Sequence, residues 1–260
     1  MITVALTQPP GDGPARAAAI RVEFAGPARQ GRLTVLSRLI LAVPHFVCLG
    51  IAGIATQIVV VGGWLVALVK GRPSGPAAEY LVGYHQWKTR LHAYLLLLTG
   101  KYPPVGWRND LYPVGVAVRP GQLNRMAVLS RLILVIPALL TEVVLACGLV
   151  AIVMPITWLI VLILGEMPRP LHDAITAVTR YMARINGYMY LLTSAYPAGL
   201  FGDQRAGIIV ADYSAPSEQQ WQLVLSGSAK ALVSLILGAG AATITGITVI
   251  LLLAATTPSA

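Results

Sequence analysis

Three long apolar stretches limit what this chain can fold into more than any other feature. The first, Leu39–Val69, has His45 as its one basic group, and the second, Leu132–Leu164, has Glu142 as its one charged group. The third, Ala231–Ala255, carries no charge. Because a membrane-spanning helix needs about 20 apolar residues, these stretches predict an integral membrane protein.

The composition supports this class of protein. Hydrophobic residues make up 56% of the 260 residues and charged residues 11%, whereas soluble proteins carry about 45–50% and about 25%. This composition argues against an ordinary soluble enzyme. With a net charge of +9 spread along the edges of apolar stretches, we expect anionic membrane lipids as partners and no nucleic acid.

The first two stretches are longer than one membrane-spanning helix needs to be, and shorter than two full-length spanning helices would need. They could be strongly tilted single helices, or tight helical hairpins that bend at glycine or proline. The candidate bends are Gly50, Gly53, Gly62-Gly63, Gly148 and Pro155. The positive-inside rule favours hairpins, since an even number of crossings keeps every basic segment cytoplasmic and only the neutral tail, 256–260, outside.

The chain contains an internal duplication with an offset of 93 to 94 residues, which Arg38 with Arg131 and Tyr94 with Tyr188 illustrate. A weaker third copy follows, without the arginines. We therefore divide the chain into an N-terminal segment with a short strand (1–31), membrane repeat 1 (32–107), a linker strand (108–124), membrane repeat 2 (125–201) and a partial third repeat with the C-terminal transmembrane helix (202–260).

Short runs with strand-like alternation precede the apolar stretches. Ile20, Val22 and Phe24 alternate with polar residues, and Val114–Val118 is similar. A third run, Ile208–Val210, follows at the repeat spacing. Three equivalent strands could pair into one small sheet, provided that all lie on one side of the membrane.

Basic residues at the starts of the apolar stretches are candidates for lipid headgroup contacts, because guanidinium pairs with phosphate while its stem stays in apolar surroundings. These candidates are Arg32, Arg38, His45, Arg125 and Arg131.

An amphipathic helix is predicted after each apolar stretch, with aromatic and aliphatic residues on one face. The helix could lie in the membrane interface or pack on the hairpins. The residues that we assign to these interfacial helices are Trp87, Lys88, Arg90, Tyr94, Arg184 and Tyr188.

Glu142 is the strongest single candidate for a functional residue, since an ionisable group inside an apolar stretch costs several kcal/mol unless it is paired, protonated or hydrated. It could form an ion or proton site, or lie at the turn of a hairpin. The first copy has Cys48 at the equivalent place. His85 and His92 are seven residues apart, a poor spacing for metal ligands. We predict no metal, no cofactor and no catalytic residue.

Several motifs together carry a family resemblance. The run from Arg38 to His45, the run Trp64–Pro73 and the run Arg90–Pro104 resemble the bacterial membrane family known as domain of unknown function 4389. The resemblance covers about 32–107 and, as a second tandem copy, about 125–197. In the second copy Ala138 replaces His45. The resemblance implies a membrane topology and no particular activity.

We therefore expect an all-α integral membrane protein with a small β element. It would contain tandem helical hairpins, interfacial amphipathic helices and a C-terminal transmembrane helix. The expected function is that of a non-enzymatic scaffold or accessory subunit of a larger complex in a bacterial inner membrane, with other membrane subunits as partners. The alternatives are a small transporter or channel subunit that uses Glu142, and a lipid-modifying enzyme.

Overall fold

The computed structural model describes residues 20–24, 26–70, 74–106, 112–117, 125–202 and 223–256. Most of these residues are helical, which confirms the predicted fold class. The elements are β1 (Arg21–Phe24), α1 (Arg32–Lys70), α2 (Gly75–Leu95), β2 (Val114–Ala117), α3 (Arg125–Gly148), the π-helix η1 (Leu149–Val153), α4 (Met154–Leu164), α5 (Arg169–Met189) and α7 (Gly227–Thr256).

The first apolar stretch forms one continuous helix. α1 runs for 39 residues through Pro44, Gly50, Gly53 and Gly62-Gly63 without a break. The predicted turn within Leu39–Val69 is therefore wrong. A turn would leave backbone groups without partners in apolar surroundings, whereas a glycine inside a helix costs only about 1 kcal/mol.

The second apolar stretch is also continuous, since α3, η1 and α4 follow each other without a gap. A hairpin is therefore absent here as well. The π-helix lies between Gly148 and Pro155, the two predicted bend positions. A π-turn takes up one extra residue, and the repeat offset changes from 93 at Pro44 and Pro137 to 94 at Trp64 and Trp158. We conclude that η1 accommodates a single-residue insertion.

This insertion corrects the predicted equivalence of Glu142 and Cys48. Glu142 precedes η1, where the offset is 93 residues, so its counterpart in repeat 1 is Leu49. Leu49 is buried in α1, whereas Cys48 is exposed. The two repeats thus place an acid and an aliphatic side chain at the same inward-facing position.

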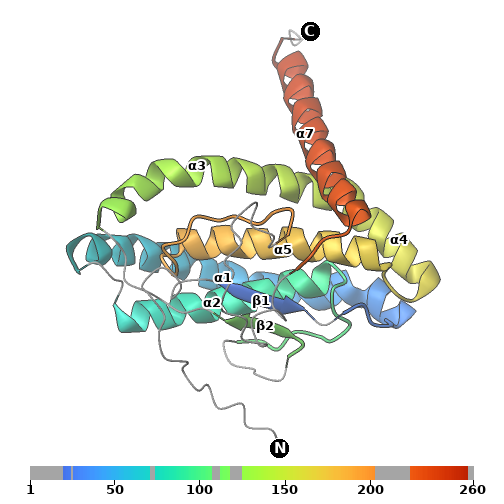
Figure 1. Cartoon of the computed structure of the whole chain (residues 1–260), viewed down its shortest axis with the longest axis horizontal. Helices are drawn as coiled ribbons and strands as arrows, with labels where there is room; N and C mark the ends of the chain where they lie inside the picture. The colour runs from blue at the N-terminus through green and yellow to red at the C-terminus, as the bar shows by residue number, and fades with distance from the viewer. Residues whose placement is uncertain are drawn as a thin grey trace, which may run out of the picture.

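The two repeats pack against each other with their ends exchanged. Arg32, which begins α1, donates to the carbonyl of Ile163 near the end of α4, and Trp64 donates to Val128 near the beginning of α3. The first helices of the repeats, α1 and α3, contact each other, as do the second helices, α2 and α5. Figure 1 shows these helices running along the long dimension of the molecule.

The strands form a small antiparallel sheet, in which Val22 pairs with Val116 and Phe24 with Val114. This confirms two of the three predicted strands; the third, 208–210, lies outside the described residues. The sheet packs on the second helices, β1 on α5 and β2 on α2. Within the described residues neither strand contacts α1 or α3. The body is therefore layered, with α1 and α3 on one side of α2 and α5 and the sheet on the other.

α7 packs on α3, η1 and α5 through its N-terminal half and then leaves the body (Figure 1). Past Gly240 none of its described residues is buried. Together with Arg32–Lys70 and Val128–Leu164, Gly227–Thr256 is long and apolar enough to cross a membrane. These segments identify the chain as a membrane protein.

Candidate functional site

Each repeat contains a buried arginine that caps the end of the following helix. In repeat 1 the guanidinium of Arg38, on α1, donates to the carbonyl of Tyr94 and, at 3.1 Å, to that of Thr99. Its second amino group donates to Gln30 Oε1 at 2.7 Å. The guanidinium also lies 4.3 Å from the centre of the Tyr94 ring. We call this arrangement the first arginine cap.

Repeat 2 reproduces this arrangement with equivalent residues. Arg131, on α3, donates to the carbonyls of Tyr188 at 2.8 Å and Thr193 at 2.9 Å. Its guanidinium lies 4.1 Å from the centre of the Tyr188 ring. This second arginine cap shows that the duplication extends to individual hydrogen bonds.

The helix ends explain why an arginine is needed at both places. Two residues after the last helical residue of α2 and of α5, the backbone is left-handed, at Leu97 (φ 62°) and Leu191 (φ 59°). Both leucines are buried. The last carbonyls of a helix lack intrahelical partners and carry partial negative charge. The guanidinium supplies several donors and a positive charge at that point.

The burial of these arginines bears on the predicted headgroup contacts. Arg38 is 0% and Arg131 4% exposed, so a lipid phosphate does not reach either guanidinium in this structure. Arg32 is exposed at the start of α1 and remains available. Arg125 begins α3, and its side chain lies outside the described part of the structure.

His45 is also internal. It lies on α1 with no exposed surface, accepts a hydrogen bond from Trp87 Nε1 at 3.0 Å, and stacks edge-on against Tyr102. Ala138 occupies the equivalent buried position in repeat 2. His45 therefore joins α1 to α2 and is not on the surface that a headgroup could touch.

The helices predicted to be interfacial form the centre of the fold. Trp87, Arg90 and Tyr94 of α2 and Tyr188 of α5 are buried, whereas Lys88 and Arg184 are partly exposed. Of the two predicted arrangements, the structure has the packed one. The aromatic face of each helix contacts its neighbours in the bundle.

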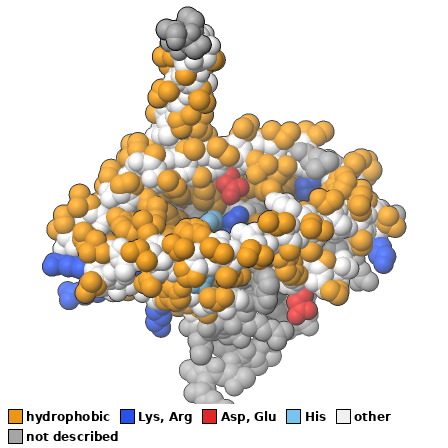
Figure 2. Space-filling model, turned by 180° about the vertical axis from the view of Figure 1, so that it is seen from behind, with side chains coloured by type: hydrophobic (Ala, Val, Ile, Leu, Met, Phe, Trp, Pro, Cys, Tyr) orange, Lys and Arg blue, Asp and Glu red, His pale blue; other side chains and the backbone are white. Residues whose placement is uncertain are grey.

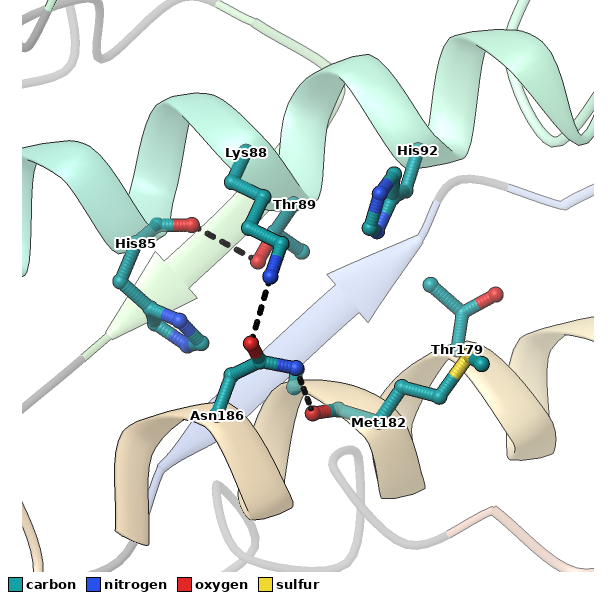
Figure 3. A pocket seen from close by; sticks show the side chains of 8 residues that line it. His85, Lys88, Thr89, His92, Thr179, Met182 and Asn186 are labelled. Atoms are coloured by element: carbon teal, nitrogen blue, oxygen red, sulfur yellow. Dashed lines mark hydrogen bonds between the residues drawn. The ribbon is translucent and has the colours of Figure 1, made fainter. Parts of the chain in front are cut away.

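The facing surfaces of α2 and α5 enclose a small pocket, shown in Figure 3. Its lining consists of four pairs of equivalent repeat positions, each 94 residues apart: His85 and Thr179, Lys88 and Met182, Thr89 and Ala183, His92 and Asn186. The pocket therefore lies where the two repeats meet face to face. Repeat 1 supplies the basic side chains together with Thr89, whereas the lining side chains of repeat 2 carry no charge.

A chain of hydrogen bonds joins three helices at this pocket. Lys88 Nζ, on α2, donates to Asn186 Oδ1 at 2.6 Å, and Asn186 Nδ2, on α5, donates to Glu142 Oε1 at 2.8 Å. Tyr190 lies beside it, with its hydroxyl 3.5 Å from Lys88 Nζ. We call Lys88, Asn186, Glu142 and Tyr190 the central polar cluster. It gives Glu142 an amide partner and a nearby cation.

The electrostatics of the pocket follow from burial. Burial, and secondly the charge of Lys88, lowers the pKa of His85 to about 3 and that of His92 to about 4. Burial also lowers the pKa of Lys88, and Glu142 opposes this effect. Both imidazoles are therefore neutral at physiological pH, and the ammonium of Lys88 is matched by one carboxylate.

The chemistry available to this site is limited by its size. The pocket has room for about one water molecule. No group of three or more potential metal ligands lies among the residues that the structure describes. The arrangement can hold the repeats together and stabilise one buried charge pair, but it offers no cavity for an organic substrate.

Several important residues carried no sequence signal that singled them out. Asn186, Tyr190 and Gln30 are ordinary polar residues in the sequence, and only the packing brings them to Lys88, Glu142 and Arg38. The repeat alignment could have indicated Asn186, since it is the equivalent of His92.

The lowered histidine pKa values predict an acid-labile fold. Between about pH 6.5 and pH 4 the unfolded chain binds protons at positions where the folded chain binds none, so the free energy of unfolding falls as the pH falls. We expect each imidazole to cost roughly 1–2 kcal/mol of stability at pH 5 relative to pH 7.5. Thermal unfolding in detergent at the two pH values measures this.

A double variant, His85→Gln with His92→Gln, provides the control, because glutamine does not bind a proton in this range. The difference in melting temperature between the two pH values should be smaller for the variant than for the natural chain. Equal differences would show that these imidazoles do not cause the acid lability.

Comparison with known protein families adds one result. The family described as Domain of unknown function (DUF4389) matches residues 32–106 and, separately, residues 125–200. Together these segments make up more than half of the chain. Each contains one arginine cap and one pocket-lining helix. No curated protein and no solved structure is detectably similar to the chain.

Proposed function

Since this chain belongs to the DUF4389 family and carries two tandem copies of its domain, we propose that it works without catalysis, as a scaffold or accessory subunit of a larger membrane complex. The observation that supports this proposal is that the interior of the fold and its exposed surface carry different kinds of side chain. The shared arginines Arg38 and Arg131 are engaged inside the fold, while the exposed surface of the long helices is largely apolar between their ends.

The internal use of the polar groups supports a structural role. Arg38 and Arg131 cap helix ends, Lys88 and Glu142 are joined through Asn186, and His45 bonds to Trp87. A catalytic group needs access to a substrate and a partner poised for proton transfer. These groups instead have packing partners in the bundle.

The exposed apolar surface supports contacts with lipid and with other membrane subunits. On α1 alone, residues such as Ile40, Ile51, Ile54 and Ile58 are more than two-thirds exposed. Exposed arginines and lysines lie near the helix ends, where they suit anionic headgroups. We place the protein in a bacterial inner membrane, with its basic segments cytoplasmic and its C-terminal tail outside.

Affinity purification at native expression in a mild detergent tests the scaffold role. We expect a second membrane protein to co-purify in constant proportion, and a reciprocal purification through that protein should return this chain. An unrelated tagged membrane protein of similar size provides the control. Recovery of a monomer alone would contradict the proposal.

The central polar cluster favours a second function, that of a small transporter or channel subunit. A carboxylate on an apolar helix, linked to a lysine through one amide, is an arrangement that can accept a proton or cation. Glu142→Gln keeps an oxygen that can accept from Asn186 but removes the charge. If this function is correct, vesicles with the natural chain lose a pH gradient faster than vesicles with the variant. Equal rates of gradient loss in the two kinds of vesicle would contradict a transporter or channel function.

A further inference from the structure

The position of the sheet indicates how the protein lies relative to a membrane. Gln86, near the middle of α2, donates to the carbonyl of Val116 in β2 at 3.0 Å. The same part of α2 packs on α1, where Trp87 bonds to His45 and Tyr80 to the carbonyl of Ala52. The sheet therefore lies alongside the apolar part of α1, and not beyond its end.

A crossing orientation of α1 conflicts with this arrangement. If α1 crossed the bilayer, β1 and β2 would lie at the depth of the hydrocarbon. A two-stranded sheet has open edges, and backbone groups at an open edge do not find partners in hydrocarbon. Glu23, on β1, would also be carried to that depth.

The length of α1 also argues against a crossing orientation. A 39-residue helix is about 58 Å long, whereas the hydrocarbon core of a bilayer is about 30 Å thick. The exposed apolar residues of α1 extend from Leu33 to Val69, so a crossing helix would need a tilt beyond the usual range.

The charges at the two ends of α1 give an independent argument. Arg29 and Arg32 are exposed before and at the start of the helix, and Lys70 is exposed at its end. A crossing would place one of these basic ends outside, against the positive-inside rule. A helix that lies along the membrane keeps both ends at the cytoplasmic surface.

The face made by α1 and α3 has the character that such an orientation needs. Figure 2 shows hydrophobic side chains over most of this face, with basic side chains near its two ends and a central hollow in which an acidic and a basic side chain are visible. α7 leaves the body past α3, away from the strands (Figure 1). Its free half, which includes Ile247, Val249 and Ile250, is exposed and apolar.

We propose that both repeats lie flat in the cytoplasmic leaflet of the membrane. The apolar face of α1, α3 and α4 contacts the acyl chains, the sheet faces the cytoplasm, and α7 alone crosses the bilayer. The partner of this face is thus a lipid leaflet, with anionic headgroups at the basic ends. This orientation does not depend on the scaffold role, because it follows from the positions of the sheet and the charges.

Depth-dependent fluorescence quenching tests the orientation. The full chain, with Cys48 and Cys147 replaced by alanine, carries one cysteine with an environment-sensitive dye at Leu41, Ile54, Val69 or Val249. All four positions are exposed. The protein is placed in vesicles of phosphatidylethanolamine and phosphatidylglycerol that contain lipids brominated either near the carbonyl or near the chain end.

We expect the Leu41, Ile54 and Val69 dyes to respond alike, with stronger quenching by the shallow bromines, and the Val249 dye to be quenched best by the deep bromines. An Ile54 dye as deep as the Val249 dye, with Leu41 and Val69 shallow, would show that α1 crosses and would overturn the proposal. A shallow Val249 dye would overturn the crossing of α7. Neither result depends on whether a partner protein exists.

Discussion

Replacement of Arg38 by alanine is expected to destabilise the fold by about 3 kcal/mol or more, because it removes the guanidinium donors of two buried carbonyls and of Gln30 Oε1, at about 1–3 kcal/mol for each lost hydrogen bond. The carbonyls are those of Tyr94 and Thr99. For a chain of this size the loss corresponds to a drop in melting temperature of about 6–12 °C. Intrinsic tryptophan fluorescence during heating in detergent measures it.

The second arginine cap and an exposed arginine provide matched comparisons. Arg131→Ala should have a similar but somewhat smaller effect, since Arg131 caps the same two carbonyl positions and Arg38 also bonds to Gln30. Arg29→Ala should change little, because its side chain is 93% exposed and its contact with Glu166 is 3.9 Å long. Equal stability of Arg38→Ala and Arg29→Ala would contradict the capping role.

The second large effect is expected where α3 and α7 cross. A side chain on Gly240 would collide with the carbonyl oxygen of Val144, and one on Gly148 with that of Ile236. Backbone atoms of a packed helix do not move aside easily, so the helices must separate. Gly240→Ala is expected to cost about 3 kcal/mol or more, at or above the upper end of overpacking effects, and to lower the melting temperature accordingly.

Gly246→Ala is the control for this prediction on the same helix. No atom lies within 4 Å of the position that its Cβ would occupy. Alanine is the better helix former by about 1 kcal/mol, so this variant should be neutral or slightly more stable. If both glycine variants behave alike, the close approach of α7 and α3 does not stabilise the protein.

The repeat could be predicted from the sequence because equivalent positions of the two copies keep the same residues. Arg38 and Arg131, Tyr94 and Tyr188, and the strand runs before each repeat all fell at an offset of 93 or 94 residues, and the structure places them in equivalent contacts. The change in offset from 93 to 94 was also visible. Its meaning, the π-helix η1, required the observed backbone, because an insertion can equally be absorbed in a loop.

The helical hairpins were predicted wrongly because hydropathy shows how long an apolar segment is. It does not show whether the segment turns back or continues as one helix. Glycine and proline at the candidate bends are tolerated inside α1, α3 and α4. Likewise, the amphipathic pattern of α2 and α5 did not show whether the aromatic face meets lipid or protein. Partners such as Asn186 for Glu142 depend on which helices pack together, and the sequence of one chain does not encode that as a local pattern.

The membrane sidedness of the two ends of α1 tests the account most directly. Single cysteines at Arg29 and at Lys70, in a chain without Cys48 and Cys147, are treated with a membrane-impermeant maleimide in intact cells and in inverted vesicles. The account predicts labelling of both positions in inverted vesicles only, and labelling of a cysteine at Ala260 in intact cells only. Labelling of positions 29 and 70 from opposite sides would contradict it.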